Sequence, residues 1–443
     1  MRQGIRLMSI WSQARLLAAK TPDDRNRYVD FLRAISILVV VSGHWLVAAL
    51  YYHDGSLSPG ALMKIQPDTR WLTWIFQVMP IFFIVGGYAN AVSIQSARRR
   101  GTDYAGWLAA RLSRLVTPTL FLLMAWAALA AILHFSGVSG RVLQLASRAA
   151  LIPTWFLAIY IMIVALAPAT YVAWRRWGFA SLWAFAILGA LGDLAYFGSD
   201  FSWIGWSNYF WVWLSVHHLG YAWRDGRLGS PAKLIAYSAL GLAALVLLTR
   251  IGPYPDAMVG SPSGEVSNTT PPKMTLLALG IFQFGLLMAI EAPMRRMLSG
   301  LRLWAATVLI NGMIMTLYLW HLTIMVIVVA LAYLAGGIGL GLEPASFDWW
   351  ITRPLWIGFL FAALLPAALL LAPLERRARP SDLPIPAAGR QIAGAALVCL
   401  GIALLAMYGF GDSPLPHLDI AAFMMVLAGA GLSGLVVLNR KRG

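Results

Sequence analysis

The chain is poor in cysteine and in charge for its length. Its 443 residues include one cysteine, Cys399, which lies in an apolar stretch. A single cysteine excludes a disulfide within the chain and a CxxC redox or zinc-ribbon site, so we expect Cys399 to be a small buried hydrophobe. Only 12% of the residues are charged, against about a quarter in soluble proteins. Because 60% of the residues are hydrophobic, the composition predicts a polytopic membrane protein.

Several motifs that carry chemistry in other enzymes are also missing. The sequence has no GxxxxGK(S/T) phosphate loop, no HExxH, no GxSxG elbow and no His-x-x-x-x-Asp acyltransferase box. Each of these patterns builds a particular site, such as a phosphate cradle, a zinc site or an activated serine. Their absence argues against ATPases, zincins and serine hydrolases, and we expect no metal cofactor.

Apolar windows of about twenty residues, the length that crosses a bilayer as a helix, are abundant. We expect twelve spans, near 31–52, 71–95, 112–136, 149–172, 178–197, 203–223, 232–250, 274–291, 303–333, 349–373, 390–410 and 419–438. Arg and Lys gather in alternate connections, which by the positive-inside rule places both termini in the cytoplasm. The net charge of +16 therefore reports membrane orientation, and we expect no nucleic-acid partner.

These windows predict an all-α fold, a polytopic transmembrane bundle of about ten core helices plus two C-terminal helices. We divide the chain into a cytoplasmic segment 1–28, a membrane domain 29–380, and a Pro-rich linker with two additional transmembrane helices in 381–443. The longest external connection, 251–273, is rich in Pro, Gly, Ser and Thr, which is typical of a surface loop or lid. It contains Asn268-Thr-Thr270, a glycosylation sequon in form.

The first span carries two ionisable residues, Arg33 and His44, eleven positions apart. On a helix this spacing places both side chains on one face, roughly 16 Å apart along the axis. Arg33 also lies three residues after Asp30, close enough for an ion pair. A titratable group deep in a bilayer is costly, which makes His44 a functional candidate. An arginine that only reaches the headgroups and a histidine satisfied in the core remain the alternatives.

Two arginines, Arg111 and Arg114, open the third span on a shared helical face. Planar guanidinium groups in this arrangement suit a bidentate grip on phosphate. Arginines at this position can also mark topology alone, so both interpretations stay open.

The ninth span holds a second deep histidine, His321, together with Asn311 and Tyr318. Tyr318 shares a face with His321 at a spacing of three residues, and His321 falls nearer the external side. A structural, hydrogen-bonded histidine is the alternative. By contrast, the neighbours His217 and His218 point in different directions and make a poor catalytic pair.

The second span contains the pair Gly86-Gly87 within an otherwise bulky run. Paired glycines in a membrane helix permit close approach of another backbone or a break that lines a cavity. Both outcomes are compatible with the sequence.

In this order, these elements resemble the acyltransferase 3 family of integral membrane acyltransferases, which are mostly bacterial. The resemblance covers roughly residues 25–380. Two positions depart from the family pattern: Gly86 stands where Ser often precedes Gly-Tyr, and Ala34 follows Arg33 where Gly is common. The matching elements are Tyr28-Val-Asp30-Phe-Leu-Arg33 with His44, Pro80-Ile-Phe-Phe-Ile-Val-Gly-Gly-Tyr88, Arg111-Leu-Ser-Arg114, Trp155-Phe-Leu157, Tyr318-Leu-Trp-His321 and Pro373-Leu-Glu375-Arg376.

The resemblance implies transfer of an acetyl or longer acyl group from cytoplasmic acyl-coenzyme A to a hydroxyl of a glycan, a lipid-linked sugar or another envelope acceptor. Coenzyme A is polyanionic, so Arg33, Arg111 and Arg114 are expected to hold its phosphates. The expected setting is a bacterial cell membrane, with membrane lipids as surroundings.

We expect His44 to act as general base. His321 would orient the acceptor or, with Tyr318, stabilise the oxyanion. A covalent route through Ser42 stays open.

Two other functions fit parts of the pattern. A transporter or flippase for an anionic lipid or sugar would also use a basic vestibule and buried histidines. A glycosyltransferase that uses a polyprenyl-phosphate sugar would need acidic residues at the external end of an early span, where the first external loop offers only Asp54 and Asp68.

Overall fold

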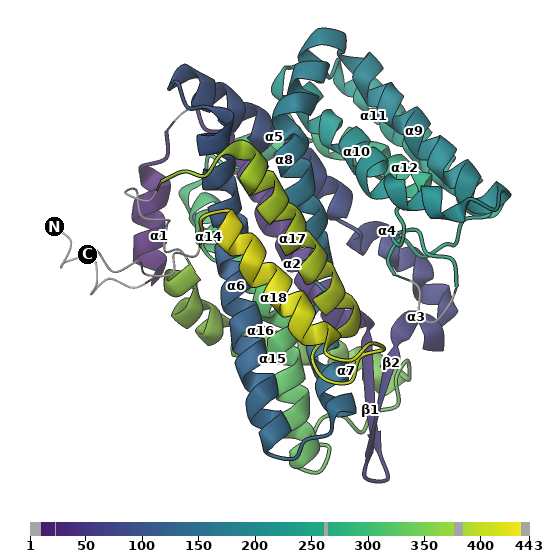
Figure 1. The fold of residues 1–443 in the computed structure, drawn as a ribbon. Coiled ribbons are helices and arrows are strands. Elements are labelled where there is room, and N and C mark those ends of the chain that lie inside the picture. Colours follow the sequence, from purple (N-terminus) through teal and green to yellow (C-terminus); the bar gives the residue numbers. More distant parts are fainter. Residues whose placement is uncertain (1–9, 23, 261–264, 376–383, 436–443) are drawn as a thin grey trace, which may run out of the picture. The chain divides into compact units, whose positions relative to one another are not determined.

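The computed structural model describes residues 10–22, 24–260, 265–375 and 384–435, and these residues form almost entirely helices (Figure 1). The chain folds into two compact units. Unit 1 comprises 1–43, 66–92 and 170–314, and unit 2 comprises 44–65, 93–169 and 315–443. The chain passes between the units five times: within α2 (Arg27–Val47), after α3 (Leu62–Ile65), within α5 (Met79–Arg99), within α8 (Thr154–Trp177) and at the first residue of α15 (Ile314–Leu334).

Unit 1 contains the first part of α2 and α5, the last part of α8, and most of the helices from the middle of the chain. Within it α12 packs on α9, α10 and α11, and α9 also packs on α10 (Figure 1). Its other elements are α1 (Ile10–Ala19), η2 (Pro67–Leu72), α4 (Thr73–Phe76), α9 (Phe179–Gly198), η3 (Ser202–Ser207), α10 (Asn208–Arg224), α11 (Pro231–Arg250), α12 (Met274–Ala289), α13 (Glu291–Met297) and α14 (Leu301–Gly312).

Unit 2 begins at His44, three residues before α2 ends, and contains the only paired strands among the described residues. Its last two helices, α17 and α18, lie side by side and pack on α6 (Figure 1). Its other elements are β1 (Ala48–His53), β2 (Ser56–Ala61), α3 (Leu62–Ile65), α6 (Tyr104–Phe135), α7 (Gly140–Leu151), α15 (Ile314–Leu334), α16 (Phe347–Glu375), α17 (Ala388–Tyr408) and α18 (Leu418–Leu432).

The all-α membrane fold predicted from the sequence is confirmed. Within the described ranges, nine helices are long and apolar enough to cross a membrane, and the pair α12 and α13, bent by 55°, is either a broken tenth span or a re-entrant loop. The two remaining windows are occupied by shorter helices, because α10 has 17 residues and α18 has 15. The basic tail at 440–442 and Arg376 of the last family element lie outside the described residues.

A β-hairpin follows α2 directly, where the sequence pattern indicated the end of a span and a loop. Strand β1 pairs antiparallel with β2 from Ala48 opposite Ala61 to His53 opposite Ser56. The two-residue turn is Asp54-Gly55, and both residues have positive φ, 46° and 77°. This is the Asp-Gly signature of a tight type I′ hairpin, in which glycine adopts the left-handed conformation without strain.

The long ninth window consists of two helices instead of one. Helix α14 ends at Gly312, Met313 leaves the helical region with φ −121° and ψ 12°, and α15 starts at Ile314. The break separates Asn311 from the polar residues further along. Asn311 donates to the carbonyl of Asp30 in unit 1, 2.8 Å away, whereas Tyr318 and His321 belong to unit 2.

The connection 251–273, predicted to be external, is held in place by hydrogen bonds at its described residues. The side-chain amide of Asn268 is fully buried, donates to the carbonyls of Pro255 and Ala257 at 2.7 and 2.9 Å, and accepts from Thr275 at 2.7 Å. The backbone N–H of Met258 donates to the hydroxyl of Thr73, which joins this connection to α4. Since the amide of Asn268 is committed to these bonds, the sequon is not available for glycosylation in this fold.

Candidate active site

The structure brings His44 and His321 into direct contact within unit 2. His44 lies near the end of α2 and His321 lies two turns into α15, 277 residues away. Nδ1 of His44 is 2.9 Å from Nε2 of His321, and the rings are nearly parallel, with an angle of 14° and centroids 5.1 Å apart. Each histidine is therefore the partner that the other needs at this apolar position.

The other ring nitrogen of His321 fixes the direction of this hydrogen bond. Nδ1 of His321 is 2.8 Å from the carbonyl oxygen of Tyr318 and 3.2 Å from that of Leu317. A carbonyl can only accept, so Nδ1 of His321 carries the proton, and in the neutral ring Nε2 is an acceptor. His44 then donates through Nδ1 and keeps the lone pair on its Nε2. No other described residue forms a hydrogen bond with that nitrogen.

Tyr318 links His321 to the start of α8. Its hydroxyl donates to the carbonyl of Pro153. Its ring meets Phe156 edge-on, with centroids 6.0 Å apart. The segment Trp155-Phe-Leu157, singled out in the sequence, thus supports the turn of α15 that holds His321.

A third contact comes from Trp45, the neighbour of His44. Its indole N–H donates to the carbonyl of His321 at 3.1 Å, and its ring packs against Phe361 of α16 at 4.8 Å. Trp45 is fully buried. Helices α2, α15 and α16 are therefore joined at the histidine pair, which limits the freedom of both imidazole rings.

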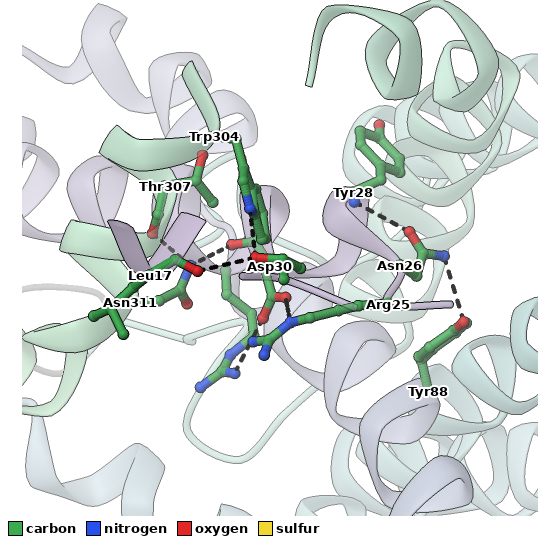
Figure 2. A network of polar contacts seen from close by, with 11 residues as sticks. Leu17, Arg25, Asn26, Tyr28, Asp30, Tyr88, Trp304, Thr307 and Asn311 are labelled. Carbon is green, nitrogen blue, oxygen red and sulfur yellow. Dashed lines mark hydrogen bonds and ion pairs between the residues drawn. The ribbon is translucent and has the colours of Figure 1, made fainter. Parts of the chain in front are cut away.

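Arg33 lies on the same continuous helix as His44, eleven residues earlier, in unit 1. Its side chain is 40% exposed and pairs with Asp30 at 3.9 Å, as its spacing predicts. Asp30 also forms an ion pair with Arg25, in which Nε of Arg25 lies 2.6 Å from Oδ2 of Asp30 (Figure 2). The guanidinium of Arg33 therefore stays accessible while Asp30 has a second cation.

The same network reaches the glycine-rich element of the second span. Asn26, just before α2, approaches the hydroxyl of Tyr88 at 3.4 Å (Figure 2) and Glu291 at the same distance. Tyr28 packs edge-on against Trp223, with centroids 6.0 Å apart. Two of the sequence elements that carry the family resemblance thus meet at the beginning of α2.

The remaining predicted cations lie on α6 in unit 2. Arg111 is half-buried and its guanidinium stacks 5.7 Å from the ring centroid of Trp107, and Arg114 is exposed one turn later. Arg33 belongs to unit 1, so the binding of one ligand by all three arginines remains a prediction.

Other histidines serve packing. His217 and His218 are both fully buried. The ring of His217 is hydrogen-bonded to Asn90 at 3.2 Å, and that of His218 to the carbonyl of Leu214 at 2.8 Å. In the described part of the chain, no three His, Cys, Asp or Glu side chains are grouped to hold a metal ion.

A multi-helix fold with membrane-spanning helices and a histidine pair between α2 and α15 defines an integral membrane protein with a polar site in its apolar interior. The sequence of the acyltransferase domain that defines the acyltransferase 3 family matches residues 26–373. The chain therefore belongs to this family.

One curated relative is the nodulation protein NolL of Sinorhizobium fredii, which is 30% identical over 142 residues. The match covers 30% of this chain and 34% of NolL, so the chain spans about a third of the length of that relative. No solved structure matches the chain.

Proposed function

We propose that this acyltransferase moves an acyl group from cytoplasmic acyl-coenzyme A to a hydroxyl of a cell-envelope acceptor, with Nε2 of His44 as the general base. The observation that carries the proposal is the chain of hydrogen bonds from the Tyr318 carbonyl through His321 to His44. It leaves one unprotonated nitrogen in a site where a neutral imidazole is the natural proton acceptor.

The transfer runs in two proton steps on that nitrogen. As the acceptor oxygen bonds to the thioester carbonyl carbon, its proton moves to Nε2 of His44. When the tetrahedral intermediate collapses, the carbon–sulfur bond breaks and the leaving thiolate takes the proton from Nε2. His321 accepts the Nδ1 hydrogen bond throughout, which stabilises the imidazolium in the way that a carboxylate does in a catalytic triad.

In this scheme His321 and Tyr318 are positioning residues. The Tyr318 hydroxyl donates to the carbonyl of Pro153, and the Tyr318 carbonyl fixes the tautomer of His321. Ser42 lies two residues before His44 and is half-buried. Its hydroxyl is the candidate nucleophile of a covalent alternative, which a trapped acyl-enzyme on Ser42 would reveal.

The donor is proposed to bind by its phosphates to Arg33, Arg111 and Arg114. Arg33 lies roughly 16 Å from His44 along the helix axis, three turns away, and a long pantetheine arm suits that separation. The family membership supports an acyl donor, and a bacterial envelope glycan or lipid-linked sugar is the proposed acceptor. A transporter of the same anionic ligand would not consume the thioester.

Purified protein in nanodiscs, incubated with labelled acetyl-coenzyme A and a membrane extract as acceptor, tests the assignment. We expect His44→Ala to lower the rate of thioester loss about a hundredfold or more, as the removal of a general base does. Arg33→Ala is expected to raise KM for the donor. His134→Ala, an exposed histidine outside the site, is the matched control. Wild-type rates in His44→Ala would overturn the assignment.

His321→Gln separates positioning from general base catalysis. The Gln oxygen can accept the hydrogen bond from Nδ1 of His44, but the amide can also flip and donate, so the tautomer of His44 is no longer fixed. We therefore expect a lower kcat, an unchanged KM for the donor and an altered pH–rate profile. A merely structural role would lower the amount of folded protein and leave the pH profile as it is.

A further inference from the structure

An apolar cavity of about 580 Å³ opens between the end of α15 and the start of α16, wholly within unit 2. Its walls include Leu331, Ala335, Leu355 and Phe359. Leu331, Leu355 and Phe359 are among the exposed large hydrophobic residues of the chain, 61%, 76% and 56% accessible. In a span that faces lipid, these residues lie at the hydrocarbon, so the cavity is open to it.

One cation, Arg353, lines this cavity. Its side chain is more than nine-tenths buried, with 8% exposure for the residue. The guanidinium stacks on Trp349, 3.8 Å from the ring centroid, and its Nη2 donates to the carbonyl of Ala48 at 3.1 Å. It forms no ion pair with any carboxylate of the described residues.

The hydrogen-bonding capacity of Arg353 is far from filled. A guanidinium has five N–H donors in its plane, and stacking on an indole covers its face without using them. Its Nε is buried and has no partner among the described residues. A buried cation with unused donors is costly unless an anion completes it, and none of the described residues pairs an anion with it.

We propose that this cavity is a binding site for a membrane lipid with an anionic phosphate headgroup, its hydrocarbon chain along α15 and α16 and its phosphate at Arg353. Charge complementarity favours an anion over a neutral lipid, and the aliphatic walls favour a hydrocarbon tail over a soluble ligand. Arg353 lies six residues after the start of α16, about 9 Å along the helix axis, which is within reach of the headgroup region. The site is separate from acyl transfer and does not depend on it.

The test uses nanodiscs of phosphatidylcholine that contain a trace of photoreactive lipid with a diazirine in its tail, carried either on phosphatidylglycerol or on phosphatidylcholine. Crosslinks to the peptides of 328–359 are counted by mass spectrometry. We expect phosphatidylglycerol to label these peptides about tenfold more than phosphatidylcholine, because the choline cation of phosphatidylcholine offsets the charge of its phosphate, whereas phosphatidylglycerol is a net anion. Equal labelling by the two lipids would overturn the proposal.

Four variants assign the preference to its causes. Arg353→Gln should equalise the two lipids, and Arg353→Lys should keep part of the preference if the charge is what matters. Ala335→Phe fills the cavity and should lower labelling by both lipids, whereas Leu334→Phe, its 79% exposed neighbour outside the lining, should not.

Arg353→Lys and Ala335→Phe keep the test open if Arg353→Gln does not fold. An unchanged preference in Arg353→Gln, or equal losses in Ala335→Phe and Leu334→Phe, contradicts the lipid site. Displacement of the lipid by excess inorganic phosphate would show a site for the free ion instead, and we expect none.

Discussion

At the scale of single residues, Lys273 shows how the fold treats a cation that it removes from water. The side chain is fully buried where the connection 251–273 meets α12. Its ammonium lies 3.5 Å from the ring centroid of Tyr196 and donates to the carbonyl of Pro271 at 3.1 Å. Burial lowers the pKa of Lys273 from its usual 10.5 to about 8, although the nearby Asp193 carboxylate opposes the shift. The cationic form is therefore tolerated rather than favoured here.

This environment gives stability a particular pH dependence. Between about pH 8 and pH 10.5 the unfolded chain holds the Lys273 proton and the folded chain has released it, so stability rises with pH in this window. Below about pH 8 both states are protonated and the contribution is constant. We expect the unfolding temperature in detergent, relative to a Lys273→Met variant, to increase from about pH 7.5 to about pH 9.5. A difference that does not change with pH would contradict this account.

The sequence was sufficient to select the candidate residues but not to predict which of them are in contact. His44, His321, Tyr318 and the arginines could each be selected as polar groups in apolar spans. The contact between His44 and His321 could not, because it joins residues 277 positions apart and leaves no local pattern. Arg353 also went unnoticed, since an arginine near the end of a span is ordinary until its cavity and its unused donors are visible.

At the scale of elements, glycine decides how closely two helices of unit 1 approach. A Cβ atom on Gly87 of α5 would lie 2.0 Å from the carbonyl oxygen of His217, and one on Gly220 of α10 would lie 2.0 Å from that of Ile84. Helix α5 is unbroken through this point. Of the two outcomes that paired glycines permit, the structure thus shows close backbone approach instead of a break.

Adding a methyl group at this crossing should push the helices apart. We expect Gly220→Ala to destabilise the protein by about 1–3 kcal/mol or more, because the clash is with backbone and not with a flexible side chain. Gly358→Ala in α16 is the control, since its Cβ would have no neighbour within 4 Å, and it should change stability by less than about 1 kcal/mol. The amount of monodisperse protein after heating in detergent measures the difference. Similar losses for both variants would show that helix propensity, not the crossing, matters.

Elements were predictable where periodicity or length defines them. The apolar windows located the spans because a bilayer sets their length. The hairpin after α2 was missed because its first strand continues the apolar run of the helix, and only Asp54-Gly55 signals the turn. The break at Met313 was missed because it lies in apolar sequence without proline and is decided by tertiary contacts such as that of Asn311 with Asp30.

At the scale of the whole molecule, the number of crossings depends on two short helices. Helix α10, with 17 residues, is about 26 Å long, slightly less than the hydrocarbon core of about 30 Å. The 3-10 turn η3 directly precedes it and extends the apolar segment. If α10, α18 and the bent pair α12 and α13 each cross once, the chain has twelve crossings and both termini lie on one side, as the distribution of arginines predicts.

The single cysteine makes this count directly testable. Cys399→Ser should be tolerated, because serine can keep the hydrogen bond of the buried thiol to the Ala158 carbonyl, and it provides a cysteine-free background.

In that background we place reporters on either side of α10, Asp200→Cys and Arg227→Cys, both at exposed positions. A membrane-impermeant maleimide on spheroplasts should label position 200 at once and position 227 only after permeabilisation, since arginine-rich connections stay in the cytoplasm. Leu415→Cys, between α17 and α18, should label from outside. Equal labelling of positions 200 and 227 from one side would mean that α10 does not cross, which would invert the orientation of every later helix and place the external ends of α15 and α16 in the cytoplasm.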